Sequence, residues 1–214
     1  MGRRNLAPLG LTAGLLLAWE AACRYLGLPD FILPAPSLIL QVAARKAPLL
    51  LVHAGATFLE ILLGILLSVL AAVPTAVAMF AHRGVERSLT PILVASQAVP
   101  VFAVAPLLVV WFGYGMASKV LMAAVIIFFP ITVSLLDGFK GCDREYRILF
   151  RLMGAGFWQT LRMLHWPFAL PAFFTGLKVG VSVATIGAVI GEWVGAQQGL
   201  GYLMIQANAR LQVD

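Results

Sequence analysis

The sequence predicts an all-α polytopic membrane protein, and three observations lead to that fold class. Hydrophobic residues make up 61% of the 214-residue chain and charged residues only 11%, whereas a soluble domain carries ~25% charged residues. The apolar residues form long runs, several of which reach the ~20 residues that cross a bilayer. The Lys and Arg residues gather mostly in short segments between those runs. We therefore expect a single membrane domain over residues 1–214.

Five apolar runs are long enough to be predicted as membrane spans. The first follows Arg3 and Arg4 and could be a signal peptide, but the rest of the chain is also membrane-embedded, so we expect it to be retained. Before the second run, residues 34–51 begin with proline and contain basic residues, which favours a short surface helix capped by Ser37. The predicted spans are residues 8–26, 57–80, 91–112, 118–136 and 168–194.

The basic residues also predict the orientation, because Lys and Arg are enriched on the cytoplasmic side of a membrane protein. With the N-terminus inside, nine of them fall in inside segments and five in outside segments, the latter including Lys119. The inside charges concentrate between residues 139 and 166. We therefore expect both the N-terminus and this loop to lie in the cytoplasm.

Prolines interrupt three predicted spans, and each removes a helix hydrogen bond. Such a break persists in a membrane where the freed carbonyl faces protein or a water-filled path. At Pro74 and Pro130 the simpler interpretation is that proline is common in membrane helices. At Pro100 the polar Ser96 and Gln97 lie beside the break, so we predict that this segment lines a path through the membrane. The alternative is that Ser96 and Gln97 form hydrogen bonds between helices.

Ionisable residues within spans are candidate functional residues, because a charge in lipid is costly. Glu60 and Glu192 lie near the outer ends of the second and fifth spans, and we predict that they guard the outer mouth of the path. The alternatives are that they reach the interface or form a structural ion pair. The last span also predicts a closely packed helix, because it carries two G-x-x-x-G pairs. These pairs are Gly176 with Gly180 and Gly187 with Gly191.

The loop over residues 139–166 is predicted to project from the membrane as two short helices joined by a glycine turn. Gly154 and Gly156 permit a turn with positive φ. A second helix is expected over residues 157–164, before Pro167 leads the chain back into the membrane. By residue chemistry alone, this basic, amphipathic pair either lies on anionic lipid or docks on a partner in the aqueous phase.

The loop also has a distinctive spacing: Gly154, nine residues, Leu164, one residue, and then Trp166-Pro167. This spacing resembles the cytoplasmic loop of the binding-protein-dependent (type I) ABC importer permeases, which docks on the ATPase. The family pattern begins with Glu-Ala-Ala, where this chain has Ile148-Leu149-Phe150. The resemblance implies an ATPase-coupling loop that contains Arg147, Arg151, Gly154, Ala155, Gly156, Trp158, Leu164 and Pro167.

The resemblance extends along the chain. Residues 53–64 resemble the second-span signature of the nitrate, sulfonate and taurine branch. The segments around Ser96-Gln97 and Gly191-Glu192-Trp193 are similar to permeases for thiamine-precursor pyrimidines such as hydroxymethylpyrimidine. This implies a permease that moves a small solute from a binding protein into the cytoplasm. The residues predicted to line its translocation path are Glu60, Ser96, Gln97, Pro100, Phe102 and Glu192.

The family resemblance also implies partners and a location. A homodimer of permeases in the bacterial inner membrane would bind two cytoplasmic ATPase subunits and a periplasmic or lipid-anchored substrate-binding protein. ATP and Mg²⁺ would bind in the partner ATPase, because this sequence has no phosphate-binding loop of the form G-x-x-x-x-G-K-[ST]. We expect no cofactor, no metal, no catalytic residue and no nucleic acid on this chain.

Other interpretations remain open. The substrate could be a sulfonate, taurine, nitrate or riboflavin. An anionic substrate would favour a positive charge in the path. The candidate for that charge is Lys178, which is expected to lie too near the cytoplasm. An ion-coupled secondary transporter would need paired buried acids or an inverted repeat. A membrane enzyme would need clustered histidines or acids. The sequence indicates none of these features. Family members continue past residues 199–202 into one more span. Because no closing helix is expected here, we predict a fragment or a truncated product.

Overall fold

The structure is a computed structural model that describes residues 6–27 and 29–210, and within these ranges it contains helices and no strand. The predicted all-α fold is therefore confirmed. The elements in chain order are α1 (Leu6–Tyr25), α2 (Pro36–Arg45), α3 (Ala47–Ala81), α4 (Arg83–Ala98), α5 (Val101–Phe112), α6 (Met116–Lys140), α7 (Arg144–Leu152), α8 (Phe157–Thr160), the π-helix η1 (Leu161–His165), α9 (Trp166–Gly195) and α10 (Leu200–Ala209).

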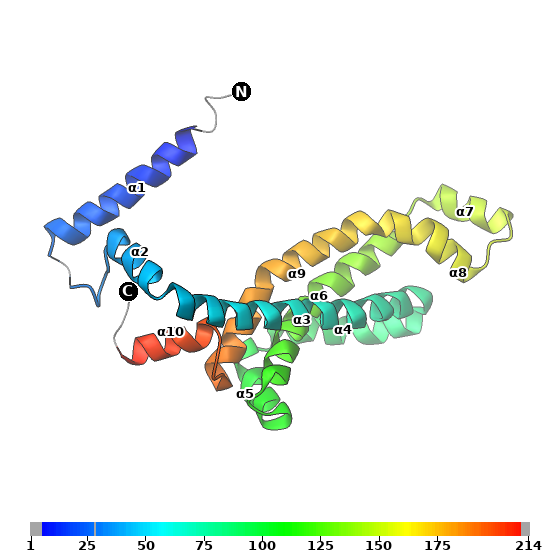
Figure 1. The fold of residues 1–214 in the computed structure, drawn as a ribbon. Coiled ribbons are helices and arrows are strands. Elements are labelled where there is room, and N and C mark those ends of the chain that lie inside the picture. Colours follow the sequence, from blue (N-terminus) through cyan, green and yellow to red (C-terminus); the bar gives the residue numbers. More distant parts are fainter. Residues whose placement is uncertain (1–5, 28, 211–214) are drawn as a thin grey trace.

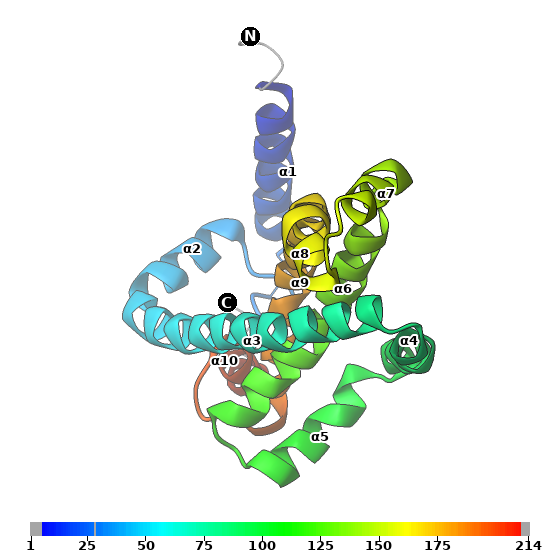
Figure 2. The same cartoon turned by 90° about the vertical axis from the view of Figure 1, so that its right-hand side faces the viewer.

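Three long helices form the centre of the molecule. α6 packs along both α3 and α9, and α4 and α5 pack beside this group. α7 and α8 project from one end of the centre as a hairpin, while α1 stands away from it and contacts chiefly α2 (Figures 1 and 2). The loop over residues 139–166 was predicted to project as two short helices, and it does project from the centre as a hairpin.

Among the described residues, three helices are long and apolar enough to span a membrane: Ala47–Ala81, Met116–Lys140 and Phe157–Gly195. α4 and α5 qualify only as a pair, bent by 102°. The predicted span over residues 91–112 is therefore divided at Pro100, where the sequence predicted a helix break, and its two halves do not form one straight helix. Its break falls at Val99 and Pro100, which are both extended, because a residue before proline is disfavoured in the helical conformation.

The expected second short helix of the hairpin is not a separate element. α8 continues through η1 into α9 as one helix of 39 residues, so Pro167 does not interrupt it. Pro167 lacks an N–H and would leave a carbonyl of the preceding turn unpaired. The chain accommodates it with a widened turn, in which the Trp166 N–H donates to the Leu161 carbonyl. One arm of the hairpin is thus the direct extension of a membrane helix.

A short helix follows the Gly-rich turn, after which the sequence predicted no further membrane helix. Gly199 adopts φ +122°, a backbone conformation that favours glycine. The ten residues of α10 follow it and turn back toward α3 and α9. This helix is about 15 Å long, which is shorter than a membrane span.

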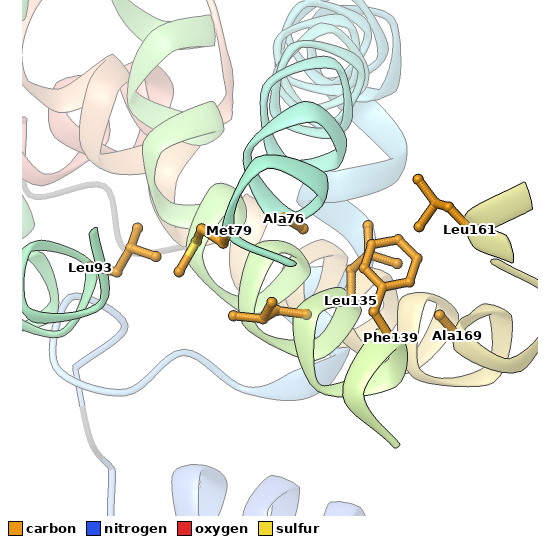
Figure 3. Packing of buried hydrophobic residues seen from close by; sticks show 8 residues of the cluster. Ala76, Met79, Leu93, Leu135, Phe139, Leu161 and Ala169 are labelled. Atoms are coloured by element: carbon orange, nitrogen blue, oxygen red, sulfur yellow. The ribbon is translucent and has the colours of Figure 1, made fainter. Parts of the chain in front are cut away.

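The core at the hairpin end joins five elements. Figure 3 shows Met79 of α3, Leu93 of α4 and Phe139 of α6 gathered with Leu161 of η1 and Ala169 of α9. Phe139 is fully buried, and burial of a large apolar side chain stabilises by about 1.5–3 kcal/mol. This core holds the base of the hairpin against the ends of α3 and α6.

The small residues of the last span pack where the sequence predicted close approach. A Cβ on Gly176 would lie 2.6 Å from the Pro130 carbonyl oxygen of α6, and one on Gly187 would lie 3.0 Å from the Cα of Ala123. The first contact is closer than real Cβ atoms show, and the second is tighter than nine in ten real Cβ contacts. The glycine face of α9 is therefore used within the chain, against α6.

Gly176→Ala is expected to destabilise the protein by about 1–3 kcal/mol, because the new methyl group must displace the α6 backbone. The matched control is Gly55→Ala on α3, where a Cβ meets no atom within 4 Å and alanine favours the helix. Thermal unfolding of both variants in detergent checks this. Equal melting temperatures would contradict the close packing of α9 on α6.

Candidate functional site

The break between α4 and α5 borders a small hollow. Its volume is about 90 Å³, and Ser96 and Gln97 contribute the polar part of a lining that is otherwise apolar. Ser96 Oγ donates to the Leu93 carbonyl of its own helix at 2.7 Å, and Gln97 Nε2 donates to Ser96 Oγ at 3.4 Å. The described contacts of these two side chains are local, so they do not join α4 to another helix. Both groups remain available to the hollow.

The other two residues predicted near the break lie beside this hollow. Pro100 is the residue before α5. Phe102 is half exposed on α5, and its ring lies 5.6 Å from the ring of Trp193 on α9. The predicted path residues of α4 and α5 are therefore grouped around the break, whereas the two acidic residues lie elsewhere.

Glu192 lies inside the helix packing, where it joins α9 to α3 and α10. Its side chain is 1% exposed. Thr57 Oγ1 donates to Glu192 Oε1 at 2.6 Å, and the backbone N–H groups of Gly201 and Tyr202 donate to Oε2 at 2.5 and 3.4 Å. The carboxylate thus satisfies N–H groups in the first turn of α10, where a negative charge is favourable.

Two further bonds attach the start of α10 to α3. The Leu200 N–H donates to Thr57 Oγ1, and the Gly199 N–H donates to His53 Nδ1, both at 2.9 Å. His53 is buried and its ring stacks with Tyr202.

Glu60 forms the structural ion pair that the sequence left open as an alternative. Lys119 Nζ of α6 lies 3.4 Å from Glu60 Oε1, and the two side chains are 7% and 3% exposed. Glu60 Oε2 has no hydrogen-bond partner within the described residues, and Glu192 is the neighbouring carboxylate. Lys119 was assigned to an outer loop, and the structure places it in the core instead.

We name these residues the buried charge cluster: His53, Thr57, Glu60, Lys119 and Glu192. No paired buried acids were expected from the sequence, but the fold brings Glu60 and Glu192 together. One available signal was missed, namely the spacing of His53, Thr57 and Glu60, which places polar side chains on one face of an otherwise apolar helix. The remaining members come from α6 and α9, and no local pattern connects them to α3.

The hairpin turns as the glycines predicted, but through one of them only. Gly154 adopts φ +74°, and the Ala155 N–H donates to the Phe150 carbonyl at 3.0 Å. Gly156 has φ −73°, so a positive φ at Gly156 is not observed. Four apolar side chains around this turn are exposed, and we call them the tip surface: Leu152, Met153, Trp158 and Met163.

The other residues assigned to the coupling loop have different surroundings. Leu164 is buried in the packing beneath the hairpin, so it anchors the loop. Pro167 lies in the first turn of α9. Arg147 is half-buried, Arg151 is exposed, and both line a cavity between the hairpin and the end of α3.

Comparison with known proteins agrees with this architecture. Residues 64–214 match the family described as binding-protein-dependent transport system inner membrane component. A probable ABC transporter permease protein of Haemophilus influenzae is 46% identical over 211 residues, which cover 99% of this chain and 86% of that protein.

Several relatives have names that state a substrate, and two of these are 42% identical to this chain. The formylaminopyrimidine transport permease ThiX of Halalkalibacterium halodurans is 42% identical over 88% of this chain and 75% of its own length. The riboflavin transport system permease RibX of Chloroflexus aurantiacus is 42% identical over 89% of this chain and 72% of its own length. With the broken span, the projecting hairpin and the helical core in place, the chain belongs to the binding-protein-dependent ABC transporter permeases of the inner membrane.

Proposed function

We propose that this permease imports a small, uncharged heteroaromatic solute, with a thiamine-precursor pyrimidine as the best candidate. The observation that carries this proposal is the lining of the hollow at the broken span. It offers one hydroxyl and one carboxamide among apolar side chains, and no charged side chain. Such groups suit the ring nitrogens and amide of a pyrimidine, whereas a sulfonate would favour a cationic partner.

Two relatives at 42% identity support the same class of substrate, whereas relatives at 30–31% identity are named for taurine and aliphatic sulfonates. ThiX is a formylaminopyrimidine permease, and RibX, at the same identity, is a riboflavin permease. Both substrates are heteroaromatic, so riboflavin is the second candidate. Lys178 is exposed on α9 and is not among the residues that line the hollow.

We further propose that the tip surface docks on a cytoplasmic ATPase and that the permease acts as a homodimer. The apolar, exposed side chains of the tip are suited to a protein contact. Since α8 continues into α9, a displacement of the docked tip would pass directly into a membrane helix that carries Glu192. We propose as well that the N-terminus lies in the cytoplasm, on the same side of the membrane as the hairpin.

Uptake by proteoliposomes tests the substrate proposal. The vesicles would contain the permease, its ATPase and its binding protein, with labelled formylaminopyrimidine, riboflavin or taurine outside and ATP inside. We expect ATP-dependent accumulation of the pyrimidine and none with a non-hydrolysable ATP analogue. Accumulation of riboflavin alone would favour the second candidate, and accumulation of taurine alone would overturn the assignment to an uncharged substrate.

Gly154→Ala is expected to lower ATP-driven uptake, because a residue with a Cβ is strained at φ +74° by about 1–2 kcal/mol and the tip would shift. The matched control is Gly156→Ala, two residues away. Its φ of −73° suits alanine, and a Cβ meets no atom within 4 Å at either position. Uptake and substrate-stimulated ATP hydrolysis are the measurements. An equal loss in both variants would contradict a specific role for the Gly154 turn.

A further inference from the structure

A cavity separates the hairpin from the end of α3 that faces it. Its volume is about 300 Å³, far above the ~15 Å³ that one water requires. One side of the cavity is cationic, with Arg147 and Arg151 of α7 beside His165. Another side is aromatic, with the rings of Phe80 and Phe157 6.3 Å apart. The lining contains no acidic side chain.

The two arginines have no counter-ion within the part of the chain that the structure describes. They lie four residues apart on α7, so both guanidinium groups can reach one bound group. The described ion pairs involve other residues, and Asp143 and Glu145 of the same segment pair with neither arginine. Arg147 Nε is buried and has no hydrogen-bond partner. A buried donor without a partner is costly, which points to an anionic ligand in the cavity.

The aromatic side of the cavity indicates what kind of anion binds there. Phe80 is the penultimate residue of the membrane-spanning α3, and its ring packs against the core at the hairpin end. The cavity therefore lies at the boundary between the apolar span and the basic hairpin. A ligand that fits must present a compact negative group to the arginines and an apolar portion to the rings, and a phospholipid has both parts at this depth.

We propose that this cavity binds the headgroup phosphate of an anionic phospholipid, held by Arg147 and Arg151 with its glycerol and first acyl carbons against Phe80 and Phe157. Planar guanidinium groups bind phosphate oxygens through paired hydrogen bonds. The lipid would attach α7, the free arm of the hairpin, to the leaflet, while the other arm is already part of α9. This site does not depend on the substrate of the permease, and none of the tip-surface residues lines it.

Native mass spectrometry of the purified full-length chain tests the proposal. The protein in detergent would be titrated separately with dioleoylphosphatidylglycerol, dioleoylphosphatidylcholine and inorganic phosphate. Dioleoylphosphatidylcholine has the same phosphate and acyl chains but no net charge. Arg147→Gln and Arg151→Gln are each expected to weaken phosphatidylglycerol binding about fivefold. The matched control is Arg162→Gln, which removes one positive charge from the same hairpin at a separate hollow beside Trp158.

The outcomes separate the lipid from other occupants. Selective retention of phosphatidylglycerol, weakened at Arg147 and Arg151 but not at Arg162, supports the site. Equal weakening by all three variants would show only a general charge effect and would overturn it. Binding of inorganic phosphate without phosphatidylglycerol would overturn it as well, and so would phosphatidylglycerol binding that is unchanged in the Arg147 and Arg151 variants. If Arg147→Gln does not fold, the proposal is still tested by phosphatidylglycerol binding to two other variants, Arg151→Gln at an exposed position and Arg147→Lys.

Discussion

Lys119→Met is expected to destabilise the folded permease by about 3–5 kcal/mol, the range observed when one partner of a buried ion pair is removed. The side chain of Lys119 is 7% exposed, and its Nζ lies 3.4 Å from Glu60 Oε1. Without it, the carboxylates of Glu60 and Glu192 would be neighbours with no cation between them in an environment of low dielectric constant. Thermal unfolding in detergent should show a melting temperature lower by on the order of 10 °C.

Two controls make the Lys119 result specific. The double variant Lys119→Met/Glu60→Gln removes both charges of the pair and is expected to recover most of the lost stability, because no unpaired charge remains at Glu60. Lys140→Met breaks the ion pair between Lys140 and Glu86, in which the two side chains are 42% and 30% exposed. This change should lower the free energy of unfolding by no more than about 1 kcal/mol. Similar losses for Lys119→Met and Lys140→Met would contradict the burial of the cluster.

The second large effect is expected at Glu192, where alanine should cost about 3–5 kcal/mol. The substitution would leave the N–H groups of Gly201 and Tyr202 without their acceptor, and each unsatisfied buried donor costs about 1–3 kcal/mol. The Thr57 hydroxyl would keep only its second acceptor, the His53 carbonyl at 3.2 Å. Part of this loss is offset because Glu60 loses a neighbouring negative charge. We therefore expect the change to be largest at α10, which should detach from α3 and α9.

Amide hydrogen exchange measures this local effect directly. In Glu192→Ala the protection of the Gly201 and Tyr202 amides should fall more than that of amides in the middle of α6. Thr57→Val, which keeps the side-chain volume but removes the hydroxyl, should give a smaller loss in the same residues. Glu145→Ala removes an exposed carboxylate that has no ion pair among the described residues. It should leave the protection of the Gly201 and Tyr202 amides unchanged. Unchanged exchange in Glu192→Ala would show that the carboxylate does not hold α10.

The buried charge cluster also bears on how the permease moves. It joins α3 through Thr57 and Glu60, α6 through Lys119, and α9 through Glu192. Opening it would expose unpaired charges, so we expect the three central helices to move as one body during transport. The break between α4 and α5 contains Pro100 and lacks the helix hydrogen bonds of a continuous span, which makes it the more plausible place for a change of angle.

Several features of this protein could be predicted from the sequence because they depend on neighbouring residues. Apolar runs predicted the membrane helices, since a helix in lipid satisfies its own backbone hydrogen bonds. Gly154 predicted the hairpin turn because glycine readily adopts positive φ. Pro100 predicted a helix break because proline fixes φ and lacks a backbone N–H. The glycine pairs predicted that α9 packs closely on some other helix, although not on which one.

Other features were decided only by the tertiary structure. Lys119 near the start of a helix is compatible with either solvent or the core, and only its position beside Glu60 placed it in the core. Thr57 and Glu192 are 135 residues apart, so no local pattern predicts their hydrogen bond. Pro167 was expected to end a helix, but one wide turn allowed the helix to continue. The sequence by itself thus determined where helices form in the membrane, whereas the partners that neutralise buried charge and hydrogen-bonding groups were determined by packing, because those partners come from distant helices.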